Sequence, residues 1–175
     1  MFGLPHFVVF FEVTDQQRRI VVAILEILKD FFFFAVPYNK SMNIQIRYLS
    51  KLGHTKAIAE AIARGANAKA LSITEEPELK EHVDLLFLGG APYANIMDKA
   101  LSQYVKALTK EMVDEVVLFT TSNWSRRTVN SIRKTLTKKG IAVRKDYFYA
   151  HMLRIEKRVP AAEEFGAKHV KESQK

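Results

Sequence analysis

The sequence has 175 residues, with 27 Lys and Arg against 19 Asp and Glu, no cysteine, and an apolar fraction of 48%. This length and composition suit one globular domain of ordinary size and exclude a disordered or fibrous chain. The absence of cysteine excludes a disulfide scaffold, a thiol nucleophile and any metal site with cysteine ligands.

The first 41 residues differ in composition from the rest of the chain. They hold eight of the 12 Phe residues and balance four basic with four acidic side chains, so the net charge of +8 belongs to residues 42–175. His6–Val13 is apolar and predicts a strand. Thr14–Gln17 matches a capping box, and the helical spacing of apolar residues that follows predicts an amphipathic helix ending near Pro37.

The status of this Phe-rich N-terminal extension is open. Glu26, Lys29 and Asp30 interrupt its longest apolar stretch, which disfavours a membrane span or a cleaved signal peptide. An interfacial helix that attaches to a membrane and a packed accessory helix are two further interpretations. We favour another interpretation, in which Met42 is the true start of the protein and residues 1–41 are a start-site artefact. Residues 42–175 then form the domain.

From Met42 onward, strand patterns alternate with helix patterns. Strands are predicted at 43–49, 69–73, 83–88, 115–120 and 141–149. Helices are predicted at 56–64, around 101–108, in a basic stretch that ends at Gly140, and from Pro160, which should lie in the first turn of the closing helix. This alternation predicts an α/β fold with a doubly wound, five-stranded parallel sheet.

In such sheets, ligands bind beyond the carboxyl ends of the strands, which directs attention to the loops after the first, third and fourth strands. The first of these loops holds Ser50, Gly53 and Thr55 directly before a helix. A tight turn at a glycine can aim backbone N–H groups inward, and hydroxyl groups can add donors, so the loop can hold a phosphate group. An ordinary helix cap explains the same residues equally well.

The pattern S-x-x-G-x-T, between a strand and an Ala- and Ile-rich helix, resembles the phosphate loop of the FMN-binding flavodoxins. Gly89–Tyr93 is similar to the glycine-, proline- and aromatic-containing loop that flanks the flavin ring in that family, and Thr120–Trp124 resembles its other ring-contacting loop. The resemblance covers about three-quarters of the chain, from Met42 to the closing helix. It implies a flavodoxin-like three-layer sandwich and FMN as the cofactor.

The resemblance assigns roles to ten residues. It implies that Ser50, Gly53, His54 and Thr55 bind the FMN phosphate through backbone amides and hydroxyl groups. It implies that Tyr93 stacks on the isoalloxazine and that Ala91, Pro92, Thr121 and Ser122 line the ring. Trp124, the only tryptophan, is a candidate to cover the other ring face, although a surface position at a helix start would also explain it.

Two features depart from the family pattern. Leu52 occupies a position where flavodoxins usually have a small hydroxyl residue, which removes one donor to the phosphate. Flavodoxins that carry electrons are typically acidic, whereas this chain is basic. These departures leave open a flavodoxin-fold interaction module that no longer binds FMN.

The positive charge is concentrated in residues 126–158, which contain eleven Lys and Arg against only two Asp and Glu. Such a field would attract an acidic partner, a phosphorylated substrate, nucleic acid or an anionic membrane, although a solvated helix face is an equally good explanation. The basic helix has no interleaved aromatic residues for base stacking, so we do not expect a nucleic-acid partner.

The leading hypothesis is an FMN-binding electron-transfer protein that exchanges electrons with a redox protein or a small-molecule acceptor. No residue needs to act as a catalytic acid or base, and the five histidines show no metal-binding spacing such as HExxH. A rival is a flavin-dependent oxidoreductase of the same fold, similar to the basic flavodoxin-like protoporphyrinogen oxidases or to quinone reductases. We expect a cytoplasmic location, with membrane association through residues 1–41 as the alternative.

Overall fold

The computed structural model describes residues 15, 16, 22 and 42–174. Asp15, Gln16 and Val22 have helical backbone and exposed side chains. The predicted strand His6–Val13, most of the helix after it, and the interpretations of the extension lie outside the described residues. Within the described part, no helix combines the length and the apolar character that a membrane crossing requires.

Five parallel strands form the central sheet, as the sequence predicts. Their spatial order is β2-β1-β3-β6-β7, so the chain winds outward in both directions from β1 and β3. The strands are β1 (Ile44–Leu49), β2 (Ala70–Ser72), β3 (Val83–Gly90), β6 (Val113–Ser122) and β7 (Ala142–His151). All pairings in this sheet are parallel. Because the sheet is parallel, the carboxyl ends of all five strands face the same edge.

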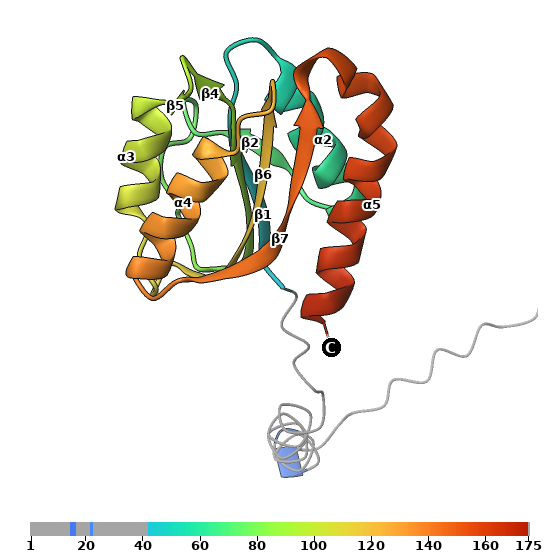
Figure 1. Cartoon of the computed structure of the whole chain (residues 1–175). Coiled ribbons are helices and arrows are strands. Elements are labelled where there is room, and N and C mark those ends of the chain that lie inside the picture. The colour runs from blue at the N-terminus through green and yellow to red at the C-terminus, as the bar shows by residue number, and fades with distance from the viewer. Residues whose placement is uncertain (1–14, 17–21, 23–41, 175) are drawn as a thin grey trace, which may run out of the picture. The chain divides into compact units, whose positions relative to one another are not determined.

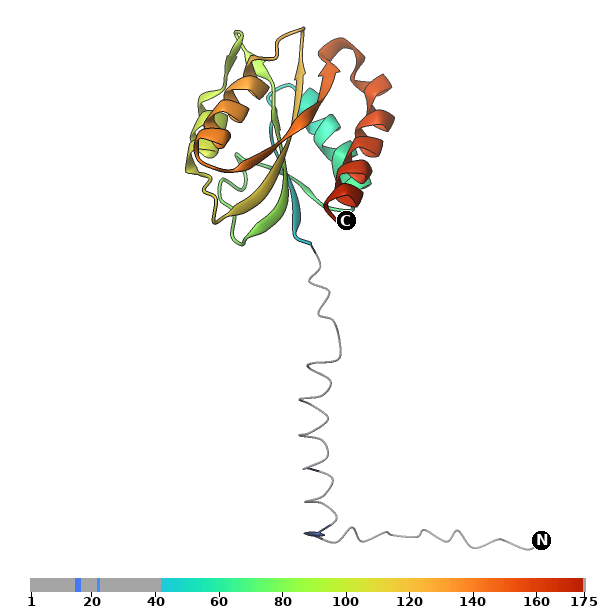
Figure 2. The same cartoon turned by 60° about the horizontal axis from the view of Figure 1, so that its bottom comes forward.

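Four helices cover the two faces of the sheet, which gives three layers (Figures 1 and 2). Helices α2 (His54–Ala66) and α5 (Ile155–Ser173) lie on one face, and α3 (Lys99–Ala107) and α4 (Arg127–Lys138) lie on the other. Each face has its own apolar core. Phe87 of β3 belongs to the core under α2 and α5, and its neighbour Leu88 belongs to the core under α3 and α4. This alternation explains why β3 is a nearly continuous apolar run.

The closing helix begins earlier than predicted. Helix α5 starts at Ile155, so Pro160 lies inside the helix rather than in its first turn. A proline inside a helix removes the N–H that would bond to the carbonyl four residues earlier, here that of Glu156, and its ring crowds that carbonyl. Both residues are exposed, so water can satisfy that carbonyl and the helix continues.

Two features of the strands are absent from the sequence prediction. A short antiparallel hairpin, β4 (Pro92–Tyr93) and β5 (Ile96–Met97), follows β3 at the carboxyl edge of the sheet. The register between β6 and β7 also shifts after Val116, where β7 bulges. The guanidinium of Arg133 in α4 donates to the carbonyls of Arg144 and Lys145 within this bulge.

Candidate functional site

A cavity of about 470 Å³ opens at the carboxyl edge of the sheet, where the loops after β1, β3, β6 and β7 meet. Its volume falls within the range of about 300–1,000 Å³ that is typical of small-molecule sites. The cavity is lined by Ser50, Leu52, His54, Thr55, Ala91, Pro92, Tyr93, Ala94, Asn95, Thr121, Ser122, Asn123, Ser125 and Met152.

The fold brings the three predicted loops together around this cavity. Eight of the ten residues singled out from the sequence line it: Ser50, His54, Thr55, Ala91, Pro92, Tyr93, Thr121 and Ser122. Gly53 lies among them in the chain and precedes α2. Neither Gly53 nor Trp124 is part of the cavity lining.

The first loop leaves the N-terminus of α2 without a side-chain cap. Gly53 is the residue before the helix and has a φ of 82°, a left-handed conformation that glycine adopts without strain. No side chain of the described chain caps this helix, and its first turn contains no acidic residue. The first N–H groups of a helix have no acceptor within the helix, so they remain able to donate to an anion at the cavity.

A buried hydrogen bond joins the first and third loops. The hydroxyl groups of Thr55 and Thr121 lie 2.7 Å apart, and both side chains are almost fully buried. Either hydroxyl can be the donor, and the one that accepts keeps its own hydrogen free to donate. The bond therefore joins two residues that line the cavity. It also leaves the Thr55 hydroxyl less available to bind a phosphate group than the sequence predicted.

Tyr93 is held by the first loop. Its hydroxyl accepts a hydrogen bond of 2.8 Å from the backbone N–H of Lys51, and the Lys51 ammonium lies 4.6 Å from the ring centre. The same ammonium pairs with Asp98 at 2.6 Å, and this hydrogen bond holds the pKa of the Asp98 carboxyl below its usual value. Lys51 thus orients the aromatic ring at the cavity wall.

The β4–β5 hairpin, which contains Tyr93, has a strained turn. Ala94 and Asn95 have φ values of 48° and 65°, as a two-residue turn with left-handed central residues requires. Asparagine tolerates this conformation, but alanine adopts it at a cost of roughly 1–2 kcal/mol. Both Ala94 and Asn95 are part of the cavity lining.

Trp124 lies at the rim. Its side chain is 81% exposed, its φ is 70°, and its ring forms a T-shaped contact with the His151 ring at 5.3 Å between centres. The backbone is held by Tyr149, whose hydroxyl accepts from the Trp124 N–H and donates to the Ser122 carbonyl, both at 3.0 Å. The loop is therefore fixed while the indole remains free of the cavity wall.

Sequence reasoning assigned no role to five further lining residues, namely Ala94, Asn95, Asn123, Ser125 and Met152. Met152 begins a short 3-10 helix, η1 (Met152–Arg154), directly after β7. The rule that ligands sit beyond the carboxyl ends of strands applies to β7 as well, so it would have identified this loop. Leu52, which we noted as a departure from the family pattern, lines the cavity and is 68% exposed.

A larger and more open depression, of about 970 Å³, lies between β7 and α5 and is lined by residues such as Phe148, Arg158 and Phe165. It is a shallow cleft against the edge strand of the sheet. We place the candidate site in the smaller cavity because that cavity is more enclosed and because several loops at the carboxyl edge supply its lining.

Comparison with solved structures identifies the fold. A flavodoxin from the domain Archaea matches with a TM-score of 0.60 and 18% sequence identity, covering 77% of this chain and all of the other. Oxidised Flavodoxin 2 from Bacillus cereus matches with a TM-score of 0.55 and 13% identity, covering 74% of this chain and 98% of the other.

A metal-soaked flavodiiron core from a Synechocystis species matches with a TM-score of 0.62 and 15% identity. The match covers 87% of this chain but only 41% of the flavodiiron core. No family model matches the sequence, and no curated protein matches it either. At these identities the similarity establishes the fold, which is flavodoxin-like.

Proposed function

We propose that this protein binds FMN in the cavity at the carboxyl edge of its sheet and uses it to transfer electrons. One observation carries the proposal: eight residues from three separate loops, selected from the sequence for an FMN site, line a single cavity. Flavodoxin-fold proteins named as flavodoxins are among the solved structures that resemble this chain.

The phosphate of FMN fits the first loop. The uncapped N-terminus of α2 offers the backbone N–H groups of His54 and Thr55 as donors to the phosphate. Gly53, in its left-handed conformation, forms the turn that places these two residues at the start of the helix. The Ser50 hydroxyl lies at the same wall. Among the described residues, no Asp or Glu lines the cavity, so none of their carboxylates opposes the phosphate charge. Leu52 adds no donor, so backbone groups carry most of the binding in this proposal.

The flavin ring fits between the second and third loops. Tyr93 presents an aromatic face that its hydrogen bond with Lys51 holds in place, and Pro92 and Thr121 limit the access of water. When bound, FMN supplies the one- or two-electron chemistry, which the side chains of the cavity do not provide. The residues of this chain bind the cofactor, orient it and shield it. We assign Trp124 to the rim of the cavity rather than to the ring.

Titration of the purified full-length protein with FMN, followed by quenching of flavin fluorescence, tests the proposal. We expect saturable binding to one site, and at least about tenfold weaker binding of riboflavin, which lacks the phosphate that the first loop should hold. Tyr93→Ala should weaken binding of both flavins, whereas Tyr93→Phe, which keeps the ring, should largely retain it. A colourless protein that ignores added FMN would overturn the proposal and favour an interaction module.

A second part of the proposal concerns the partner. Within residues 42–174, the exposed large apolar side chains all follow strand ends at this edge of the sheet: Leu52, Ile96, Trp124 and Leu153. Arg126, Arg127, Arg154 and Arg158 add positive charge to the loops and helix starts beside them. We propose that an acidic redox protein docks on this apolar and basic rim. Turnover with a quinone or a porphyrinogen would instead favour the oxidoreductase alternative.

A further inference from the structure

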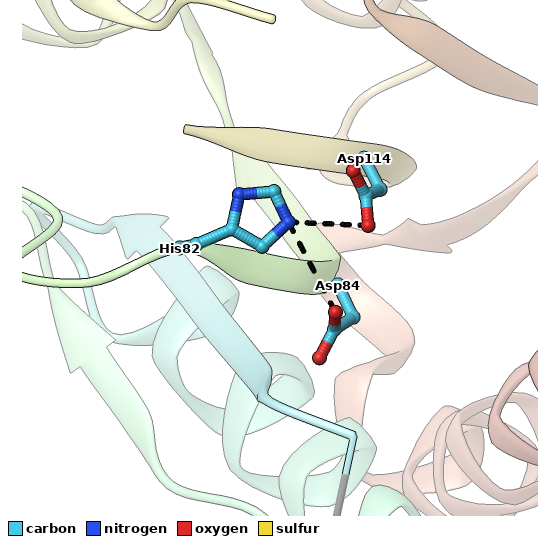
Figure 3. A group of neighbouring side chains, drawn as sticks. All are labelled: His82, Asp84 and Asp114. Atoms are coloured by element: carbon cyan, nitrogen blue, oxygen red, sulfur yellow. Dashed lines mark ion pairs between the residues drawn. The ribbon is translucent and has the colours of Figure 1, made fainter. Parts of the chain in front are cut away.

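Three potential metal ligands meet at the opposite edge of the sheet from the FMN cavity. His82 directly precedes β3, Asp84 is its second residue, and Asp114 is the second residue of β6. The Nε2 atom of His82 lies 3.1 Å from Asp114 Oδ2 and 3.9 Å from Asp84 Oδ1 (Figure 3). Among the described residues, this is the only group of His, Asp and Glu side chains whose ligand atoms converge in this way.

The other nitrogen of the His82 ring determines what faces the two carboxylates. His82 Nδ1 lies 2.9 Å from the backbone carbonyl of Glu111. A carbonyl can only accept, so Nδ1 carries a proton in both charge states of the ring. The Glu111 carbonyl and Asp114 raise the pKa of His82 and so favour the protonated ring, in which Nε2–H donates to Asp114. In the neutral ring, Nε2 instead presents its lone pair to the two carboxylates. A lone pair that faces two carboxylate oxygens is repelled by both. A cation between the three atoms removes this repulsion, and a hydrogen bond from the second ring nitrogen to a carbonyl is the usual support of a metal-bound histidine.

Backbone contacts hold the ligands in position. The N–H of Asn43 donates to Asp84 Oδ2 at 2.6 Å, which turns the other oxygen of this carboxylate toward His82. The Asn43 side-chain amide donates to the His82 carbonyl at 2.7 Å. Pairing of Val83 with Val113 fixes the separation of β3 and β6 at this point. Asp84 and Asp114 are therefore placed by the sheet, and contacts from Asn43 hold Asp84 and the backbone of His82 beside it.

We propose that His82, Asp84 and Asp114 bind a divalent transition-metal ion of the zinc type. Zinc bonds to nitrogen and oxygen are about 2.0–2.2 Å long, which places tetrahedral ligands roughly 3.4 Å apart. The separations of 3.1 and 3.9 Å from His82 Nε2 bracket this value, so small rotations of the side chains suffice. Imidazole with carboxylates suits zinc and its neighbours in the first transition series better than magnesium or calcium.

The bound ion would link the starts of two neighbouring central strands. Asp114 is 61% exposed and His82 is 39% exposed, so water can reach the ion and complete its coordination. The site lies at the amino ends of the strands, whereas the FMN cavity lies at their carboxyl ends. Its effect should therefore be on the stability of the sheet, and the inference does not depend on the proposed function.

Isothermal titration of the full-length protein with Zn²⁺, after removal of any histidine tag, tests this inference. We expect saturable binding of about one ion per chain. His82→Gln and Asp114→Asn should each weaken binding by at least about 10- to 100-fold, because losing even a supporting contact has that effect at many metal sites. His151→Gln, at the opposite edge of the sheet, is the matched control and should bind Zn²⁺ like the unchanged protein.

Two further measurements make the result decisive. Titration with Co²⁺ should produce visible absorption bands that are absent from His82→Gln, and the FMN affinity of His82→Gln should be unchanged. Melting curves in the presence of a chelator show whether each variant is folded. If His82→Gln is unfolded, the Zn²⁺ titration of Asp114→Asn, at an exposed position, tests the inference in its place. The absence of saturable Zn²⁺ binding, or binding that survives both substitutions, would overturn the inference and leave His82 as a protonated ion-pair partner of the two carboxylates.

Discussion

The hydroxyl groups of Thr55 and Thr121 are buried and depend on each other for hydrogen bonding. Replacing Thr55 with valine preserves the shape of the side chain but leaves the Thr121 hydroxyl without its partner. We expect Thr55→Val to lower the free energy of unfolding by about 1–3 kcal/mol, measured by urea denaturation. The double variant Thr55→Val/Thr121→Val should recover part of this loss; additive losses would show that the two hydroxyls do not act as a pair.

Ala94 is strained in its left-handed conformation, because its Cβ approaches the following carbonyl group. Ala94→Gly removes this strain but increases the conformational freedom of the unfolded chain, so the net gain should be about 0.5–1 kcal/mol. Ala100→Gly, at an exposed position within α3, should lower stability by a similar amount and serves as the control. Thermal unfolding measures both, and a loss of stability in Ala94→Gly would contradict the assigned turn.

His169 is fully buried and neutral in the folded protein. The Arg144 guanidinium lies 2.6 Å from its Nδ1 and can only donate, so Nδ1 accepts. Burial, together with the positive charge of Arg144, lowers the pKa of His169, although Asp146 and Glu172 oppose this effect. The unfolded chain then takes up a proton as the pH falls below about 6.5, whereas the folded protein resists.

The stability that His169 contributes should therefore be complete above about pH 6.5 and be lost as the pH falls toward its lowered pKa. Urea unfolding at about pH 7.5 and about pH 5.5 measures this loss. His169→Gln cannot titrate, so the difference between the two pH values should be smaller in the variant, whatever its absolute stability. An equal or larger difference in the variant would contradict a lowered pKa.

At the scale of elements, α2 and α5 pack with their backbones in close approach. A Cβ atom added to Gly65 would lie 1.8 Å from the Glu163 carbonyl oxygen, and one added to Gly166 would lie 2.3 Å from that of Ile62. In an isolated helix, Gly→Ala adds about 1 kcal/mol of stability. Here we expect Gly166→Ala to lower the free energy of unfolding by at least about 1–3 kcal/mol, because the helices must separate. Any gain in stability by chemical denaturation would contradict this packing.

The sequence was sufficient to predict the elements whose apolar pattern repeats. The buried run of β3 and the spacing of Leu101, Tyr104 and Val105 in α3 identified the layers, because burial on the sheet imposes these periods. The hairpin β4–β5 was missed because its turn is Ala94–Asn95, without the glycine that usually marks such a turn. Contacts between segments that are distant in the chain leave no local pattern in the sequence, so they could not be predicted from it. The contact between His82 and Asp114 is one example.

At the scale of the whole molecule, the net charge of +8 should affect electron exchange. If the basic rim faces a reduced cofactor, an anionic acceptor is attracted and a neutral one is not. We expect ferricyanide to reoxidise the FMN-loaded, reduced protein at a rate that falls as the salt concentration rises, whereas the rate with a neutral quinone should change little. Stopped-flow absorption measures both rates. Equal salt dependence for the two acceptors would contradict steering by this surface.

The positive charge near the cavity should also raise the reduction potential of bound FMN. Within residues 42–174, no acidic side chain lines the cavity, and Arg126 and Arg127 lie at the start of α4 beside it. Added negative charge on a bound cofactor should therefore be stabilised. We expect a potential less negative than that of an acidic flavodoxin, and a more negative one in Arg126→Gln/Arg127→Gln. Lys134→Gln/Lys138→Gln makes the same change of charge on later turns of α4 and should shift the potential less. Redox titration measures the reduction potential of each protein. Equal shifts of the potential in the two double variants would contradict this prediction, because they would show that only the net charge matters and not the position of the charges.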